Sequence, residues 1–317
     1  MTRGGDHSVL IGLSAVVFAL KDRRLVVLTT GEGTGEPGLP FGSFDPDRHR
    51  TFELALRAFV AEQTAFPLGF VEQLYTFGDA GRDLPRAEMG AGERRIVSVG
   101  YLALTPEAGA VGGDGAAADW SRVLDIFPWE DRRGGPAPLI EAVIAGGLRD
   151  WAARDAVRTA RADSLFALAP GSRWNEEKVL ERYELLYEAG LAPEAARDRG
   201  AAPAAGAPLG RPMASDHRRI LATGLGRLRA KLKYRPVIFD LVPDEFTLSE
   251  LQAAAEAVAG LSLHKQNFRR GIERAGLAEP TGRRLTGTGG RPAELYRRAV
   301  AEGLSGQAPG LALPAQR

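Results

Sequence analysis

The feature that most constrains the fold is a pair of short helices predicted in the last quarter of the chain. Thr247 followed three residues later by Glu250 is a capping box, which marks the start of a helix. The apolar pattern extends this helix to about Ala259, and Gly260 is typical of a helix stop. A second helix is expected over residues 263–275. Two helices joined by a glycine turn predict a helix-turn-helix unit.

The second predicted helix has an apolar and a polar side. Phe268 and Ile272 fall on one side of a helical wheel, which leaves basic and amide side chains on the other. Arg can read guanine edges, and Gln or Asn can read adenine, so this face suits the major groove of DNA. A solvated basic face that binds nothing is the alternative. The DNA-contacting residues predicted on this helix are Lys265, Gln266, Asn267, Arg269 and Arg270.

A basic, glycine-rich segment at residues 283–292 follows the two helices. Its glycines suit a tight hairpin, and its arginines would rest on the phosphate backbone as the wing of a winged helix does. A helix-turn-helix followed by such a hairpin favours DNA binding over the solvated face. The predicted wing contacts are Arg283, Arg284 and Arg291.

The net charge of +1 hides an asymmetry along the chain. Residues 1–210 contain 23 Lys and Arg against 30 Asp and Glu, a balance of −7. Residues 211–300 contain 17 against 9, a balance of +8. A basic segment after an acidic body is the pattern expected when one domain meets phosphate.

The N-terminal part is predicted to combine strands with a helix. The apolar runs Val9–Leu20 and Leu25–Leu28 flank a polar turn and predict a hairpin, and neither reaches the roughly 18 residues of a membrane span. Thr51–Thr64 has helical spacing, and Phe70–Phe77 and Ile96–Leu104 read as further strands. No signal-peptide cleavage site follows the first run, and the absence of cysteine excludes a disulfide framework. A cytoplasmic protein is expected.

Three regions are predicted from these patterns. Residues 8–190 would form the body with a helical extension, residues 191–215 an Ala/Pro/Gly-rich linker, and residues 216–300 the DNA-binding domain. The last region would begin with a helix over His217–Tyr234. The predicted fold class is α+β: an N-terminal mixed-sheet α/β/α domain followed by a C-terminal winged helix-turn-helix domain.

The body resembles a Nudix domain in residues 42–47, the helix through Arg57, residues 70–79 and residues 97–104. The Nudix box is G-x5-E-x7-R-E-U-x-E-E-x-G-U, where U is a bulky apolar residue. With its arginine placed on Arg57, the next carboxylate positions are Ala58, Ala61 and Glu62, and His49 stands at the upstream glutamate. Nudix hydrolases hold Mg²⁺ through these carboxylates, and magnesium needs hard oxygen ligands. The resemblance therefore implies a nucleotide pocket without a metal site or catalytic residues.

A Nudix-like body followed by a winged helix resembles the Nudix-related regulators of NAD metabolism. The resemblance lies in residues 246–252, 265–270 and 290–297. Residues 39–42 and 127–130 are most similar to the alphaproteobacterial, NadQ-type branch of repressors of NAD synthesis. This implies a repressor that requires no cofactor, binds operator DNA, and responds to a nucleotide effector: NAD, ADP-ribose or ATP.

A homodimer is expected, with two recognition helices about 34 Å apart in successive major grooves of a palindrome. The rival hypothesis is an active Nudix-type pyrophosphohydrolase acting on ADP-ribose or NADH, against which Ala58 and Ala61 argue.

Six residues of the body are candidates for nucleotide binding, each with a structural alternative. Tyr75 and Phe77 alternate on one strand and would otherwise be core aromatics. Asp79 and Arg82 could meet ribose and phosphate or form a loop salt bridge. Arg57 could hold a phosphate or pair with Glu62.

Overall fold

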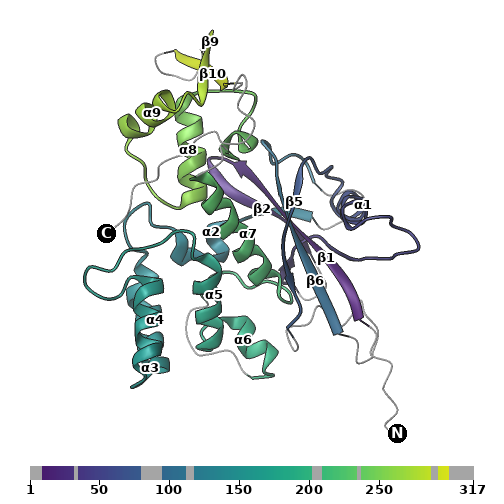
Figure 1. Cartoon of the computed structure of the whole chain (residues 1–317), viewed down its shortest axis with the longest axis vertical. Helices are drawn as coiled ribbons and strands as arrows, with labels where there is room; N and C mark the ends of the chain where they lie inside the picture. The colour runs from purple at the N-terminus through teal and green to yellow at the C-terminus, as the bar shows by residue number, and fades with distance from the viewer. Residues whose placement is uncertain are drawn as a thin grey trace.

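The computed structural model describes residues 9–31, 35–79, 95–111, 118–201, 209–233, 237–286 and 292–299. Its N-terminal part is built on a seven-stranded sheet in which β1 and β6 are parallel and the other pairs antiparallel (Figure 1). The main path runs β3-β2-β1-β6-β5, while β4 pairs with β1 and β7 with β2. The strands are β1 (Val9–Lys21), β2 (Arg24–Gly31), β3 (Pro37–Gly38), β4 (Phe41–Ser43), β5 (Val71–Phe77), β6 (Arg95–Leu104) and β7 (Ala118–Arg122). The predicted hairpin and mixed sheet are confirmed.

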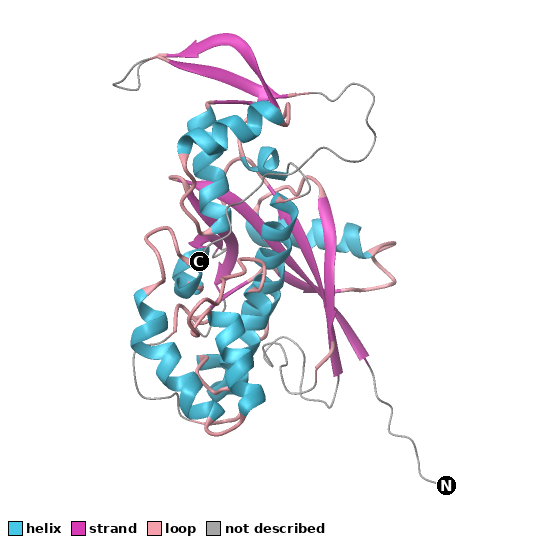
Figure 2. Ribbon diagram, turned by 60° about the vertical axis from the view of Figure 1, so that its left-hand side comes forward, coloured by secondary structure: helices cyan, strands magenta, loops and turns pink. Residues whose placement is uncertain are grey.

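Helices cover both faces of this sheet (Figure 2). Side chains alternate along β1, so that Leu13 and Val17 pack on the side of α1 (Phe52–Thr64). Val16 and Phe18 point to the opposite side, where the larger core continues into the C-terminal helices. The helix predicted over 51–64 is confirmed, with Thr51 as its N-cap.

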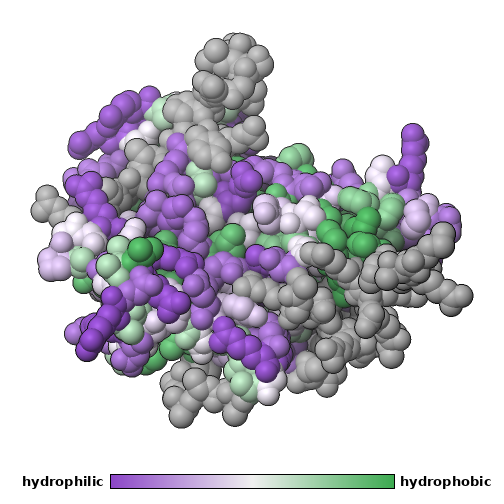
Figure 3. All heavy atoms as spheres, turned by 60° about the horizontal axis from the view of Figure 1, so that its bottom comes forward, coloured by the Kyte–Doolittle hydropathy of each residue, from purple (hydrophilic) through white to green (hydrophobic). Residues whose placement is uncertain are grey.

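A group of helices lies to the left and lower left of the sheet in the view of Figure 1. The stretch after residue 138 begins with a π-helical turn, and Ala153 at a φ of 48° separates α3 from α4. The outer surface of this end is mostly hydrophilic, with apolar side chains in small separate groups (Figure 3). The elements are α2 (Val123–Ile126), η1 (Pro128–Glu130), η2 (Ile140–Ile144), α3 (Ala145–Ala152), α4 (Ala156–Phe166), α5 (Val179–Glu188) and α6 (Pro193–Asp198).

The C-terminal part stands at the other end of the sheet. Its two helices and hairpin follow the order of a winged helix, and the hairpin projects at the top of Figure 1. Its elements are α7 (His217–Leu232), η3 (Val237–Leu241), β8 (Glu245–Phe246), α8 (Leu248–Ala259), α9 (Lys265–Arg274), β9 (Ala278–Leu285) and β10 (Ala293–Arg298), with β8, β10 and β9 forming a small sheet.

Two observations bear on the predicted division of the chain. Within the predicted linker 191–215, α6 is helical and its Glu194 and Ala195 are buried, so at least this part is packed. The helix predicted at His217 is present, but α7 packs against the sheet, where a Cβ added at Gly100 would lie 3.2 Å from Ile220 Cγ2. This packing favours a boundary after α7 over the predicted one at residue 216. Among the described residues, no helix is long and apolar enough to cross a membrane.

Candidate functional site

Local hydrogen bonds fix the turn between α8 and α9. The Thr247 hydroxyl accepts from the Glu250 amide at 3.2 Å, and the Glu250 carboxylate accepts from the Thr247 amide at 2.7 Å, which completes the predicted capping box. Gly260 ends α8 at a φ of +68°, where a side chain would be strained. Gln252 donates to the Leu263 carbonyl at 2.8 Å, so the turn is tied back to α8. The start of α9 is therefore held in one orientation.

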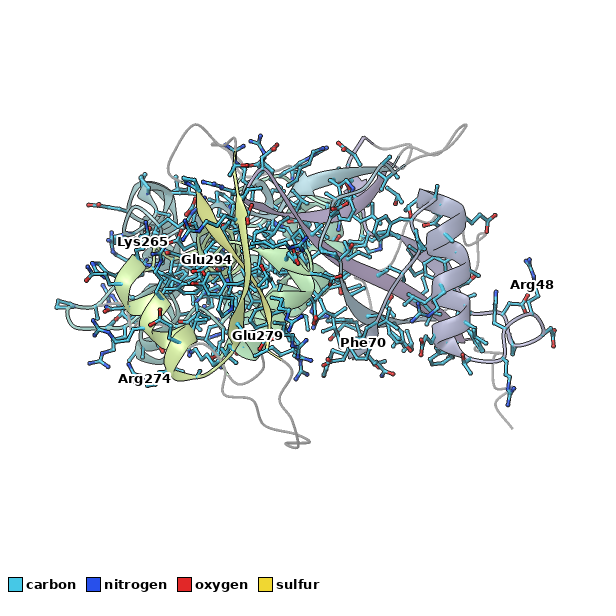
Figure 4. All side chains as sticks on the ribbon, turned by 90° about the horizontal axis from the view of Figure 1, so that it is seen from above. Arg48, Phe70, Lys265, Arg274, Glu279 and Glu294 are labelled. Carbon is cyan, nitrogen blue, oxygen red and sulfur yellow. The ribbon has the colours of Figure 1, made fainter. Side chains whose placement is uncertain are left out.

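α9 presents a polar face to solvent. Phe268 and Ile272 are buried against the rest of the domain, as predicted. Lys265 and Arg274 lie at opposite ends of α9, beside the hairpin that contains Glu294 (Figure 4). Arg274 is exposed and was not among the predicted contacts, although its position after Arg270 on the same helix could have suggested it. Of the predicted contacts, Arg269 is half-buried, and the exposed ones are Lys265, Gln266, Asn267 and Arg270.

The wing is the antiparallel pair β9 and β10. Arg284 is exposed on β9, as its predicted role needs. Arg283 is also largely exposed but pairs with Glu245 of β8. Its charge is therefore partly neutralised within the protein. The sequence gives little sign of this partner, because β8 is only two residues long. Arg291 lies outside the described residues.

On α1, which carries the Nudix-like pattern, the partner of Arg57 differs from the predicted one. Its guanidinium donates to Glu53 Oε1 at 2.8 Å and 3.0 Å, one helical turn earlier, and also to the Leu68 carbonyl. The alternative in which Arg57 pairs with Glu62 is wrong, since Glu62 is exposed and the i, i+4 partner is better placed. The Glu–x3–Arg spacing would have revealed this pair.

The aromatic candidates of β5 have different surroundings. Phe77 is 4% exposed and belongs to the core, whereas Tyr75 is 60% exposed. A bulge between Gln73 and Thr76 shifts the register of β5, so strict alternation does not hold there. The two rings still touch, with centroids 5.2 Å apart. The core alternative thus holds for Phe77 and not for Tyr75.

Asp79 takes part in a cluster of charges with α7. Its carboxylate pairs with Arg219 at 2.6 Å, and Arg219 also pairs with Glu184 and with Asp216 at 3.2 Å. The guanidinium of Arg219 lies 5.1 Å from the ring centroid of Phe77. The salt-bridge alternative therefore accounts for Asp79, with Arg219 of α7 as a partner, while Arg82 lies outside the described residues.

The five described nucleotide candidates do not form one cluster. Arg57 and Glu62 belong to α1 on one face of the sheet, while Phe77 packs into the core on the opposite face. Tyr75 and Asp79 are at the edge strand β5 and just after it. A nucleotide bound against Arg57 and Glu62 of α1 would therefore not contact Phe77, and one bound against Phe77 would not contact α1.

The fold defines a class of protein: a Nudix-like α/β body with a mixed sheet, joined to a C-terminal winged helix domain. Residues 238–298 match the family model of the NrtR DNA-binding winged helix domain. The chain is 39% identical over 88 residues to the ADPR responsive transcriptional repressor NtrR of Acinetobacter baylyi. That match covers 28% of this chain and 35%, about a third, of the relative's length.

Solved structures show the same arrangement over most of the chain. Shewanella oneidensis NrtR, in complex with a 27mer DNA, is 23% identical, with a TM-score of 0.51 over 91% of this chain and 93% of that one. A MutT/nudix family protein from Enterococcus faecalis is 16% identical, with a TM-score of 0.55 over 94% and 90%. At these identities the likeness concerns the fold, and it confirms the predicted Nudix-like domain followed by a winged helix.

Proposed function

We propose that this protein is a transcriptional repressor that binds operator DNA through α9 and the β9–β10 wing. The observation that supports this most directly is the outer face of α9, where Lys265, Gln266, Asn267 and Arg270 are all exposed on a helix with a fixed start. Exposed amide and guanidinium groups on such a helix suit base edges in the major groove. The match of residues 238–298 to a DNA-binding winged helix domain supports the same role.

The Nudix-like body is the proposed sensor of a nucleotide. ADP-ribose is the first candidate, because the relative from Acinetobacter baylyi is named as ADPR responsive. NAD and ATP are the other candidates. No cofactor is needed for this role, since the ligand acts by binding the DNA-competent and DNA-incompetent forms with different affinity.

The proposed sensor is not an enzyme. Ala58 and Ala61 occupy two positions at which the Nudix pattern has carboxylates, and an alanine side chain offers no ligand to Mg²⁺. Glu53 is on the same helix but pairs with Arg57, so it is not available as a free carboxylate.

The target genes follow from the resemblance to NadQ-type repressors, which makes operators of NAD biosynthesis genes the proposed targets. The working form is proposed to be a homodimer, since two copies of α9 are needed to read a palindrome.

A gel-shift titration on DNA from upstream of NAD-synthesis genes tests the proposal. The protein is expected to bind and shift one of these sequences in preference to scrambled DNA of equal length. ADP-ribose, NAD and ATP are then compared for their effect on that shift. Magnesium-dependent release of mononucleotides from ADP-ribose or NADH is measured alongside. Absence of any sequence-specific shift, with or without nucleotide, would overturn the regulator; turnover comparable with that of a Nudix hydrolase would favour the enzyme.

A further inference from the structure

We propose that α7 is a coupling helix, which transmits the ligand state of the Nudix-like body to the recognition helix α9. This inference rests on the proposed function, in which a nucleotide bound to the body changes the affinity for operator DNA. The two ends of α7 contact different parts of the protein.

The first residue of α7 contacts the segment between β3 and β4. The imidazole of His217 is fully buried, and its Nδ1 accepts a hydrogen bond from the Leu39 amide at 3.0 Å. The ring of Phe41 lies 5.9 Å from the His217 ring, centroid to centroid. Any displacement of residues 39–41 therefore acts directly on the start of α7.

The same segment is fixed from the other side by α1. Gln63 Oε1 accepts from the Phe41 amide at 3.1 Å, and Gln63 Nε2 donates to the Phe41 carbonyl at 2.5 Å. Gln63 directly follows Glu62, the residue that keeps a carboxylate position of the Nudix box. Residues 39–41 thus connect α1, on one face of the sheet, to α7 on the other.

The last turns of α7 hold the end of α8. Arg229 is fully buried; its Nε donates to the Val258 carbonyl at 2.8 Å, and its Nη1 donates to the carboxylate of Glu130. The Arg132 amide donates to the Gly260 carbonyl at 2.8 Å. These contacts attach the body to the turn that precedes α9.

α7 is packed tightly enough between its ends to move as a unit. A Cβ added at Gly224 would lie 2.9 Å from Val16 Cγ1, so the middle of the helix rests closely on β1. His217 and Arg229 are twelve residues apart, which is about 18 Å along a helix. Closely packed helices shift as rigid elements and not by continuous deformation.

Gly260 gives a direct test of this connection. A Cβ at Gly260 would collide with the Glu130 carbonyl and lie 2.8 Å from Arg229 Nη2. Gly276, just after α9, also has a positive φ, of +58°, but a Cβ there would meet nothing within 4 Å. Gly260→Ala and Gly276→Ala are therefore a matched pair: both strain the backbone, and only the first disturbs the contact with the body.

The quantity to measure in the full-length protein is the coupling factor, the ratio of operator Kd with and without saturating ADP-ribose. Wild-type values of allosteric coupling are typically about 5-fold to 150-fold. Gly260→Ala is expected to bring the factor to within about twofold of 1, while Gly276→Ala keeps at least half of the wild-type factor. The Kd for ADP-ribose without DNA should be unchanged in both.

A second variant tests the other end of α7. Gln63→Leu removes both hydrogen bonds to Phe41, and Gln73→Leu, on an exposed position of β5, is its control. Gln63→Leu should also reduce the coupling factor, and adding Gly260→Ala to it should cause little further loss, because both changes interrupt one connection.

The outcomes separate the two proposals. The proposed function, and with it this inference, would be refuted if the wild-type protein bound no operator. The same holds if none of the nucleotides changed its operator Kd. If the wild-type protein has a coupling factor different from 1, and Gly260→Ala or Gln63→Leu has the same factor, only the role of α7 is overturned. Equal loss in Gly260→Ala and Gly276→Ala would also overturn it, because strain would then be the cause.

Discussion

The hydrogen bond from the Leu39 amide to His217 Nδ1 requires a neutral imidazole, because a protonated Nδ1 has no lone pair to accept it. Burial, and secondarily the charge of Arg197, lowers the pKa of His217 from 6.5 to about 4. Protonation of this ring is therefore less favourable in the folded state than in the unfolded state.

The first prediction concerns stability against pH. Between pH 6.5 and about 4 the unfolded chain binds a proton at His217 and the folded chain does not, so stability is present above this window and falls as pH decreases through it. The loss for this one group is on the order of 3 kcal/mol. Urea denaturation at a series of pH values measures it.

His217→Gln is the informative variant, since its amide oxygen can accept from Leu39 without titrating. The pH dependence should be smaller than that of the wild type within this window, whereas His264→Gln, at an exposed position, should leave it as it is. If the His217→Gln and wild-type curves run parallel, the ring does not control stability here.

A second prediction concerns the buried ion cluster around Glu130. Its carboxylate accepts from Arg182 at 2.6 Å and 2.8 Å and from Arg229, and all three side chains are fully buried. Burial would raise the pKa of Glu130, but the two guanidinium groups lower it below its ordinary value, so the carboxylate is ionised. Arg182 also stacks 3.7 Å from the Trp174 ring centroid.

Glu130→Gln would remove the carboxylate that pairs with two buried guanidinium groups. The free energy of unfolding should fall by roughly 3–5 kcal/mol, as when one partner of a buried ion pair is removed. Glu181→Gln, in an exposed pair with Lys178, should change it by less than about 1 kcal/mol. Equal effects of both variants in urea denaturation would contradict this assignment.

The winged helix was the most predictable part of the structure, because its signals are local. Thr247, Glu250 and Gly260 mark helix ends through the hydrogen bonds of neighbouring residues, and these need no knowledge of the rest of the fold. The hairpin of β1 and β2 and the helix α1 were predictable for the same reason.

The role of α7 could not be predicted, because a charge count does not show which charges are already paired. The excess of +8 over residues 211–300 predicts a surface for phosphate. In the structure, much of it is paired with carboxylates of the body, in part in the core and in part at the surface. The pairs are Arg218 with Glu194, Arg219 with Asp79 and Glu184, Arg229 with Glu130, Lys231 with Glu72, and Lys233 with Glu176 and Glu177.

The nucleotide candidates failed to converge for a related reason. Alternation along β5 placed Tyr75 and Phe77 on one face, but the bulge between Gln73 and Thr76 changed the register. A resemblance identifies the strand and the helix, and it does not fix which face each side chain occupies.

A third prediction concerns base recognition by α9. Arg270 is exposed on the outer face of the helix, one turn after Gln266. Arg270→Ala should weaken operator binding by about 1–3 kcal/mol and relax the preference at one base pair, if the guanidinium reads a guanine. Binding to a set of single-base operator variants measures this.

Arg227→Ala is the control for that experiment, since it removes an exposed arginine from α7. A uniform loss of affinity across all operator variants in Arg270→Ala would mean that Arg270 contacts phosphate and reads no base.

The last prediction concerns the two wing arginines, which differ in their partners. Arg284 is exposed, so Arg284→Ala should lower the slope of log Kobs against log salt by about 0.9, the value for one phosphate of duplex DNA. Arg283 pairs with Glu245, and Glu245→Gln should free the Arg283 guanidinium to contact the phosphate backbone of DNA. That variant is expected to bind operator and scrambled DNA more tightly by a similar factor, with a steeper salt slope. Since a neutral amide cannot hold the guanidinium as a carboxylate does, equal salt slopes in Glu245→Gln and wild type would show that Arg283 does not reach DNA.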